Sequence, residues 1–230
     1  MRAALNYGNT VLVQRGVNGG EPGGVSPALA RELARRLNVP MEFVPFEQAG
    51  LVADALRANP RAWDVMYLAV DPKRAEEIAF TAPYVQIEGW YVVRKDSPLQ
   101  SPADVDRAGI RVATGKDSAY DLFLTRNLKN ATLERGQGLK ESLALFHDKN
   151  LDVLSGVKQH MEGVLAGNPD LRLLPGRFMV IEQAMGTPKG RGDAGAAYLR
   201  AFVEEMKASG FVANELKKSG QNGAAVAPPA

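Results

Sequence analysis

The chain reads Trp63-Asp64-Val65-Met66-Tyr67-Leu68 and continues with Ala69-Val70-Asp71-Pro72-Lys73-Arg74-Ala75-Glu76-Glu77-Ile78-Ala79-Phe80-Thr81-Ala82-Pro83-Tyr84. The first six residues are mainly apolar and predict a buried strand. A polar bend follows, so we expect Arg74 just beyond the carboxyl end of this strand. Ligands of open α/β sheets bind at that end, and a guanidinium there can hold a carboxylate with two parallel hydrogen bonds. The alternative is a surface arginine that caps a turn.

Composition excludes several classes of function. The 230 residues have a net charge of only +2, with basic residues spread along the chain, whereas a nucleic-acid surface needs a concentrated basic patch. No apolar run approaches the roughly 18 residues of a membrane span. The chain lacks cysteine, which excludes disulfides, thiol catalysis and thiolate metal sites. His147 and His160 have no neighbouring carboxylates at metal-ligand spacing, so we expect no metal and no cofactor.

Strand-like and helix-like segments alternate, which predicts α/β architecture with parallel strands. Ser26-Pro27 predicts a helix N-cap followed by proline at the first helical position. A short strand at 10–14 is a further candidate, and 186–195 predicts a Gly-rich bend before a strong final helix. We expect strands at 2–5, 41–46, 63–68, 89–93, 110–113, 151–154, 171–174 and 178–182, and a helix at 118–129. The last residues, 221–230, are small or polar and predict a disordered tail.

Six stretches in order resemble the family 3 extracellular solute-binding proteins, the periplasmic receptors of polar amino acid ABC transporters. They are Gly24 to Ala30, Ala34 to Pro45, Pro72-Lys73-Arg74, Phe80-Thr81-Ala82-Pro83-Tyr84, Val93 to Pro98 and Met206 to Phe211. The resemblance covers about residues 2 to 220. It implies an α/β, two-lobed periplasmic-binding-protein fold of type II, in which each lobe is a small sheet flanked by helices. Residues 1–88 and 184–220 would form lobe I, 93–180 lobe II, and 89–92 with 181–183 a hinge of two crossings.

The resemblance also implies a function. We expect a non-catalytic receptor that captures a small carboxylate-bearing solute between its lobes for a membrane ABC transporter permease. It would be a periplasmic monomer that binds no nucleic acid. No export signal is visible at Met1 to Leu5, and we expect that it has been removed. A dehydratase of cyclic prephenate-like acids on the same scaffold and a sensor module of a signalling receptor are the alternatives.

In lobe I, Arg74 matches the family arginine that holds the ligand carboxylate. Ala69 and Asp71 stand where amino acid receptors often have Ser and Thr, so Ala69 would use its backbone. Asp71 would bind a ligand cation or cap the turn before Pro72. Asn6 would make polar contacts, while Tyr7 would cover an apolar part of the ligand or pack beneath its loop.

In lobe II, the turn Lys116-Asp117-Ser118 lies where a strand gives way to a helix. Ser118 would donate to a ligand carboxylate or act as a helix N-cap, whereas Lys116 and Asp117 are less typical of the family. The family usually has an Asp for the ligand ammonium near Val157-Lys158. Either Asp71 or Glu88 substitutes for it, or the ligand is not an ordinary α-amino acid and Lys158 binds a second anionic group. Lys158 as a solvated surface lysine and Glu88 as a hinge residue are the alternatives.

Overall fold

The computed structural model describes residues 1–230, which form two compact units. Unit 1 comprises Met1–Gln86 and Glu182–Ala230, and unit 2 comprises Ile87–Ile181. The boundaries predicted for lobe I, residues 88 and 184, each lie two residues from this division. None of the helices is both long and apolar enough to cross a membrane.

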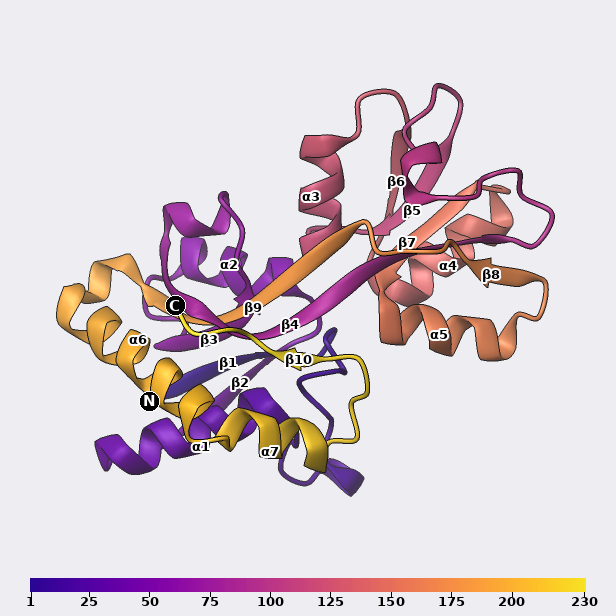
Figure 1. Ribbon diagram of the computed structural model, residues 1–230. Helices are drawn as coiled ribbons and strands as arrows, with labels where there is room; N and C mark the ends of the chain where they lie inside the picture. The colour runs from indigo at the N-terminus through magenta and orange to yellow at the C-terminus, as the bar shows by residue number, and fades with distance from the viewer. The chain divides into compact units, whose positions relative to one another are not determined.

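The sheet of unit 1 has the order β2-β1-β3-β9, followed by β4. β1 is parallel to β2 and β3, whereas β9 is antiparallel to β3. The long strands β4 and β9 continue from one unit into the other (Figure 1). The strands are β1 (Arg2–Asn6), β2 (Glu42–Phe46), β3 (Val65–Ala69), β4 (Ile78–Arg94), β9 (Met179–Pro188) and β10 (Ala225–Val226).

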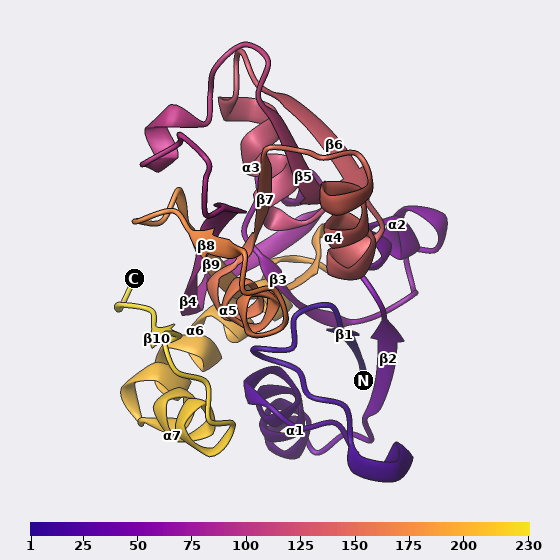
Figure 2. The same ribbon diagram turned by 90° about the vertical axis from the view of Figure 1, so that its right-hand side faces the viewer.

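Helices cover the sheet of unit 1. On one face, Val52 and Leu56 pack with Trp63, Met66 and Leu68, and the buried Trp63 indole donates to the Val52 carbonyl at 2.9 Å. α7 packs against both α1 and α6 (Figure 2). The helices are α1 (Val25–Leu37), α2 (Ala49–Ala58), α6 (Asp193–Ala208) and α7 (Phe211–Lys218), with short 3-10 turns η1 (Val17–Gly19), η2 (Arg74–Glu76) and η4 (Lys189–Arg191).

The sheet of unit 2 has the order β4-β7-β5-β6, and β8 also pairs with β4. β5 is parallel to β6 and β7, and β4 is antiparallel to β7. The strands are β5 (Arg111–Gly115), β6 (Thr132–Gly136), β7 (Val153–Val157) and β8 (Leu171–Leu173). The helices are α3 (Ala119–Asn127), α4 (Gly138–Asp148) and α5 (Lys158–Gly167), with the 3-10 turn η3 (Pro102–Asp104).

Alternation of side chains along the strands gives unit 2 two apolar layers. Val112 and Val153 pack with Leu124 of α3 on one face. Their chain neighbours Ala113 and Leu154 pack on the other face, together with Phe146 of α4 and Met161 of α5. Because both faces are covered, the inner strands are apolar on both sides, as expected of parallel strands between helices.

The structure corrects the predicted start of the first helix. Its N-cap is Gly24, with a φ of 102°, and Ser26 lies inside the first turn. Ser26 is only 1% exposed, and its hydroxyl hydrogen-bonds the Tyr84 hydroxyl at 2.9 Å. The Ser26 side chain, which the local pattern assigned to a helix cap, therefore makes a tertiary contact with a residue 58 positions away.

The structure also corrects the predicted disordered tail. Ala225–Val226 form β10, antiparallel to Val85 and Gln86 of β4. Ala227 is buried, and its N–H donates to the Tyr84 carbonyl at 3.1 Å. The segment is ordered because it pairs with an existing strand edge rather than forming a core of its own.

Other elements differ in extent. The candidate strand at 10–14 forms turns with a single bridge between Gln14 and Gly23. β4 is 17 residues long rather than confined to 89–93, and β9 continues to Pro188, into the stretch predicted as a bend. The sequence reasoning did not propose β6 or α5.

Candidate functional site

The carboxyl ends of β1 and β3 lie at the same edge of unit 1, because the two strands are parallel neighbours. β1 ends at Asn6 and β3 ends at Ala69. Asn6, Tyr7, Ala69 and the turn from Asp71 to Arg74 are therefore grouped at this edge, where ligands bind in open α/β sheets. The structure brings all five residues predicted for lobe I into one region.

Arg74 is buried, with 3% of its surface exposed. Its Nη1 donates to the carbonyl of Ala69 at 3.0 Å, so this backbone group holds the arginine. The interpretation of Arg74 as a surface arginine is therefore wrong. A contact of the Ala69 backbone with a ligand stays a prediction. A guanidinium withdrawn from water needs partners for its charge and its several donors, and burial makes its interaction with an anion stronger than at the surface.

Asp71 stabilises the turn that positions Arg74. It is 2% exposed, and its Oδ1 accepts the backbone N–H of Lys73 at 2.9 Å, while its carbonyl accepts the N–H of Ala75 at 2.9 Å. This is the behaviour of a turn-forming aspartate. Of the two roles predicted for Asp71, the structure supports turn capping.

Asn6 and Tyr7 complete the edge of unit 1. Asn6 is buried, and its Oδ1 accepts the N–H of Gly8 at 3.1 Å. The Tyr7 ring is half-buried beneath Arg15, whose guanidinium carbon lies 4.3 Å from the ring centroid. Arg15 also donates to Glu47 at 2.7 Å. Sequence reasoning missed Arg15 because no local pattern folds this loop back over Tyr7.

In unit 2, the carboxyl ends of β5 and β7 also share an edge, since the strands are parallel neighbours. Lys116, Asp117 and Ser118 follow β5, and Lys158 follows β7. Glu88 joins them from β4, because the next residue, Gly89, lies opposite Val157. The predicted residues of lobe II are thus grouped at one sheet edge as well.

The turn after β5 is held by the first turn of α3. Ser118 is the N-cap of α3, and its Oγ accepts the N–H of Asp121 at 3.0 Å. Asp117 has a φ of 55° and donates its N–H to the buried Asp121 carboxylate at 2.9 Å. The side chain of Lys116 is exposed. Ser118 therefore fills the capping role, and Asp121 is a turn-fixing residue that the sequence analysis did not identify.

Glu88 is already partnered within unit 2. One carboxylate oxygen accepts the Trp90 indole N–H at 2.8 Å, and the other accepts Arg177 Nη1 at 2.8 Å. Burial by itself raises the pKa of Glu88, but the hydrogen bonds from Arg177 and Trp90 and the nearby Lys158 outweigh it, so the pKa is lowered. The carboxylate is ionised and neutralised by residues of its own unit.

Lys158 is the first residue of α5 and is half-buried. Its Nζ lies 4.7 Å from the centroid of the Trp90 ring, an attractive cation–π contact. A cation is unfavourable in the first turn of a helix, where the helix dipole prefers an anion. Trp90 contacts both residues, because its indole N–H donates to Glu88 and its ring lies against the Lys158 ammonium.

Solved structures share this fold. A mutant of ArgBP from T. maritima aligns with a TM-score of 0.76 and 22% identity, over 96% of this chain and 95% of that chain. AbpA from Streptococcus pneumoniae, an amino acid ABC transporter substrate-binding protein bound to L-arginine, aligns with a TM-score of 0.76 and 19% identity, over 95% and 93%. The ancestral amino acid-binding protein AncCDT-1, a precursor of cyclohexadienyl dehydratase, has a TM-score of 0.74 and 19% identity, over 95% and 94%. The predicted fold class is confirmed.

Two comparisons concern the sequence itself. A membrane-bound lytic murein transglycosylase F from Shewanella is 24% identical over 215 residues, which are 91% of this chain. The chain spans 44% of the length of that relative. Residues 13–221 match the family described as bacterial extracellular solute-binding proteins, family 3. With most of its length matched, the chain belongs to that family.

Proposed function

We propose that this chain is a non-catalytic receptor that binds a small carboxylate-bearing solute for uptake by an ABC transporter. The observation on which the proposal depends is Arg74, a buried guanidinium at the carboxyl end of β3. The structurally similar AbpA is an amino acid ABC transporter substrate-binding protein bound to L-arginine. Bidentate recognition by guanidinium is the strongest carboxylate contact that these residues offer.

The ligand we propose lacks an α-ammonium group, or does not depend on one. Both acids that could substitute for the missing family aspartate are occupied: Asp71 in its turn, Glu88 by Arg177 and Trp90. Unit 2 offers the ammonium of Lys158 instead, which suits a second anionic group. A dicarboxylic or related organic acid meets these requirements better than a neutral amino acid.

Calorimetry with amino acids, monocarboxylates, dicarboxylates and amines tests this proposal. We expect saturable binding of at least one acid, with a dicarboxylate preferred over the amino acid of matched length. Failure of the folded protein to bind any compound would reject the receptor role. Binding should also decrease the radius of gyration in solution scattering, because the proposed receptor closes on its ligand.

A dehydratase is the second candidate, because AncCDT-1 is a precursor of such an enzyme and shares the fold. Such chemistry needs a protonatable acid beside the substrate. Glu88 is unsuited to this role at neutral pH because its pKa is lowered and its oxygens are partnered. Turnover of prephenate by the purified protein, lost in an E88Q variant, would favour the enzyme over the receptor.

A further inference from the structure

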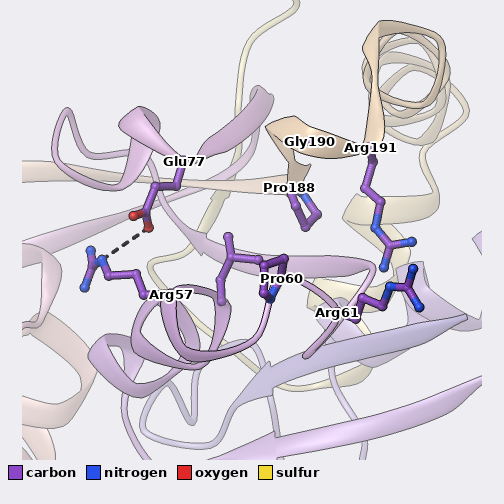
Figure 3. A pocket seen from close by; sticks show the side chains of 8 residues that line it. Arg57, Pro60, Arg61, Glu77, Pro188, Gly190 and Arg191 are labelled. Carbon is purple, nitrogen blue, oxygen red and sulfur yellow. Dashed lines mark ion pairs between the residues drawn. The ribbon is translucent and has the colours of Figure 1, made fainter.

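A hollow lies within unit 1 (Figure 3). It is near the start of β3, at the other end of the strand from Ala69, because Arg191 in its wall pairs with Asp64. Its volume is about 510 Å³, within the size range of small-molecule sites. The end of α2 and the loop that follows it form one part of its wall, and the end of β9 with the segment after it forms another. Its lining includes Leu56, Arg57, Pro60, Arg61, Pro188 and Arg191.

One end of this hollow has an excess of positive charge. Figure 3 shows the guanidinium groups of Arg61 and Arg191 at the same end, turned toward each other. Arg191 pairs with Asp64 at 2.6 Å, and the other oxygen of Asp64 accepts the N–H of Arg2 at 2.7 Å. The Arg61 guanidinium makes no ion pair. Only one carboxylate, that of Asp64, accompanies these two like charges, and it pairs with Arg191 alone. A bound anion would stabilise such an arrangement.

At the opposite end of the hollow, two carboxylates surround one arginine, so this end has a net negative charge. Arg57 pairs with Asp54 at 2.7 Å and with Glu77 at 3.2 Å. Between the two ends lie Pro60 and Pro188 (Figure 3). The largely buried Leu56 also lines the hollow. The middle of the hollow is therefore apolar, and a polyanion would leave most of its charge without a partner.

We propose that this hollow is a binding site for a small organic oxyanion, of the class of phosphate monoesters. The forked donors of Arg61 and Arg191 would bind the charged group, and the apolar part would lie against Pro60 and Pro188. The site is distinct from the edge that contains Arg74, so it stands or fails independently of the receptor function.

An NMR titration of the full chain with butyl phosphate tests the site. It follows the amide resonances of Gly190 and Arg191, so that binding near Arg74 does not contribute to the signal. We expect R61Q to weaken binding at least about tenfold, the loss typical of one charged hydrogen bond. Inorganic phosphate should bind several-fold more weakly than butyl phosphate, because it lacks apolar contacts. R200Q, which removes an exposed arginine from α6 of the same unit, should change the affinity less than about twofold.

Three results would overturn the proposal. The first is an R61Q protein with an unchanged spectrum that binds butyl phosphate as the wild type does. The second is equal affinity for inorganic and butyl phosphate. The third is Arg61-dependent co-sedimentation with phosphatidic acid vesicles without any binding of butyl phosphate, which would make the hollow a membrane contact instead.

Discussion

The two sheet edges hold their cations in different environments. In unit 1, Arg74 is buried and fixed by a backbone carbonyl of the strand that positions it. In unit 2, Lys158 is half-exposed and rests on an aromatic ring, beside an acid that Arg177 already neutralises. A fixed, forked cation suits a group that every ligand shares, whereas a half-exposed ammonium suits the group that varies. Under the proposed receptor function, unit 1 would therefore set affinity and unit 2 would set selectivity.

The largest expected effect is on Arg74. R74A should cost about 2–5 kcal/mol of binding free energy, because it leaves the ligand carboxylate desolvated and unpaired. R74K retains the charge but not the fork, so it should recover only part of the loss. Calorimetry measures both, with R200A as the matched control. Wild-type affinity in a folded R74A protein would remove unit 1 from the role we give it.

Substitution of Lys158 should change which ligands the protein prefers. K158D restores an acid near the position where the family usually has one, so we expect weaker dicarboxylate binding and stronger binding of α-amino acids. Each change should reach about tenfold, or ~1.4 kcal/mol. K158Q, which removes the cation without adding an acid, should weaken dicarboxylate binding only. If K158D leaves both affinities unchanged, unit 2 does not select through this residue.

Substitutions of Ser118 should have a smaller effect, and they distinguish a helix-capping role from a ligand-binding role. S118A should lower the free energy of unfolding by about 1 kcal/mol, whereas S118G should lower it by only a few tenths, because glycine is tolerated at an N-cap. Urea denaturation measures the difference. If the hydroxyl contacts only α3, ligand affinity should be unchanged in both variants. An equal loss of affinity in both would identify Ser118 as a ligand donor.

The smallest expected effect concerns pH. Burial lowers the pKa of His160 in α5, so the unfolded chain binds a proton at a higher pH than the folded chain. The free energy of unfolding should therefore fall as pH decreases below about 6.5, by at most ~1.4 kcal/mol per pH unit. H160Q should remove this part of the slope. A slope that survives in H160Q would assign it to carboxylates.

Local pattern was sufficient for the placement of Arg74. An apolar run followed by Asp71-Pro72 predicts a strand and a turn, and the edge of the sheet then follows from topology. It was insufficient for Ser26, whose partner Tyr84 is distant in sequence. The environments of Glu88 and Lys158 were equally unpredictable, because Arg177 and Lys158 come from segments distant from the strand that contains Glu88 and Trp90. β6, a largely polar strand that pairs only with β5, showed no apolar alternation to detect.

The short strand β10 has a mechanical consequence. It pairs with Val85 and Gln86 of β4, immediately before the chain enters unit 2 at Ile87. Lys207 of α6 also donates to the Pro228 carbonyl at 2.8 Å, which fastens this segment to a helix of unit 1. Removal of 225–228 would expose main-chain donors and acceptors of β4 to water at the place where one unit ends. A shortened chain should therefore exchange the amide hydrogen of Gln86, which faces β10, with solvent faster than the intact chain does.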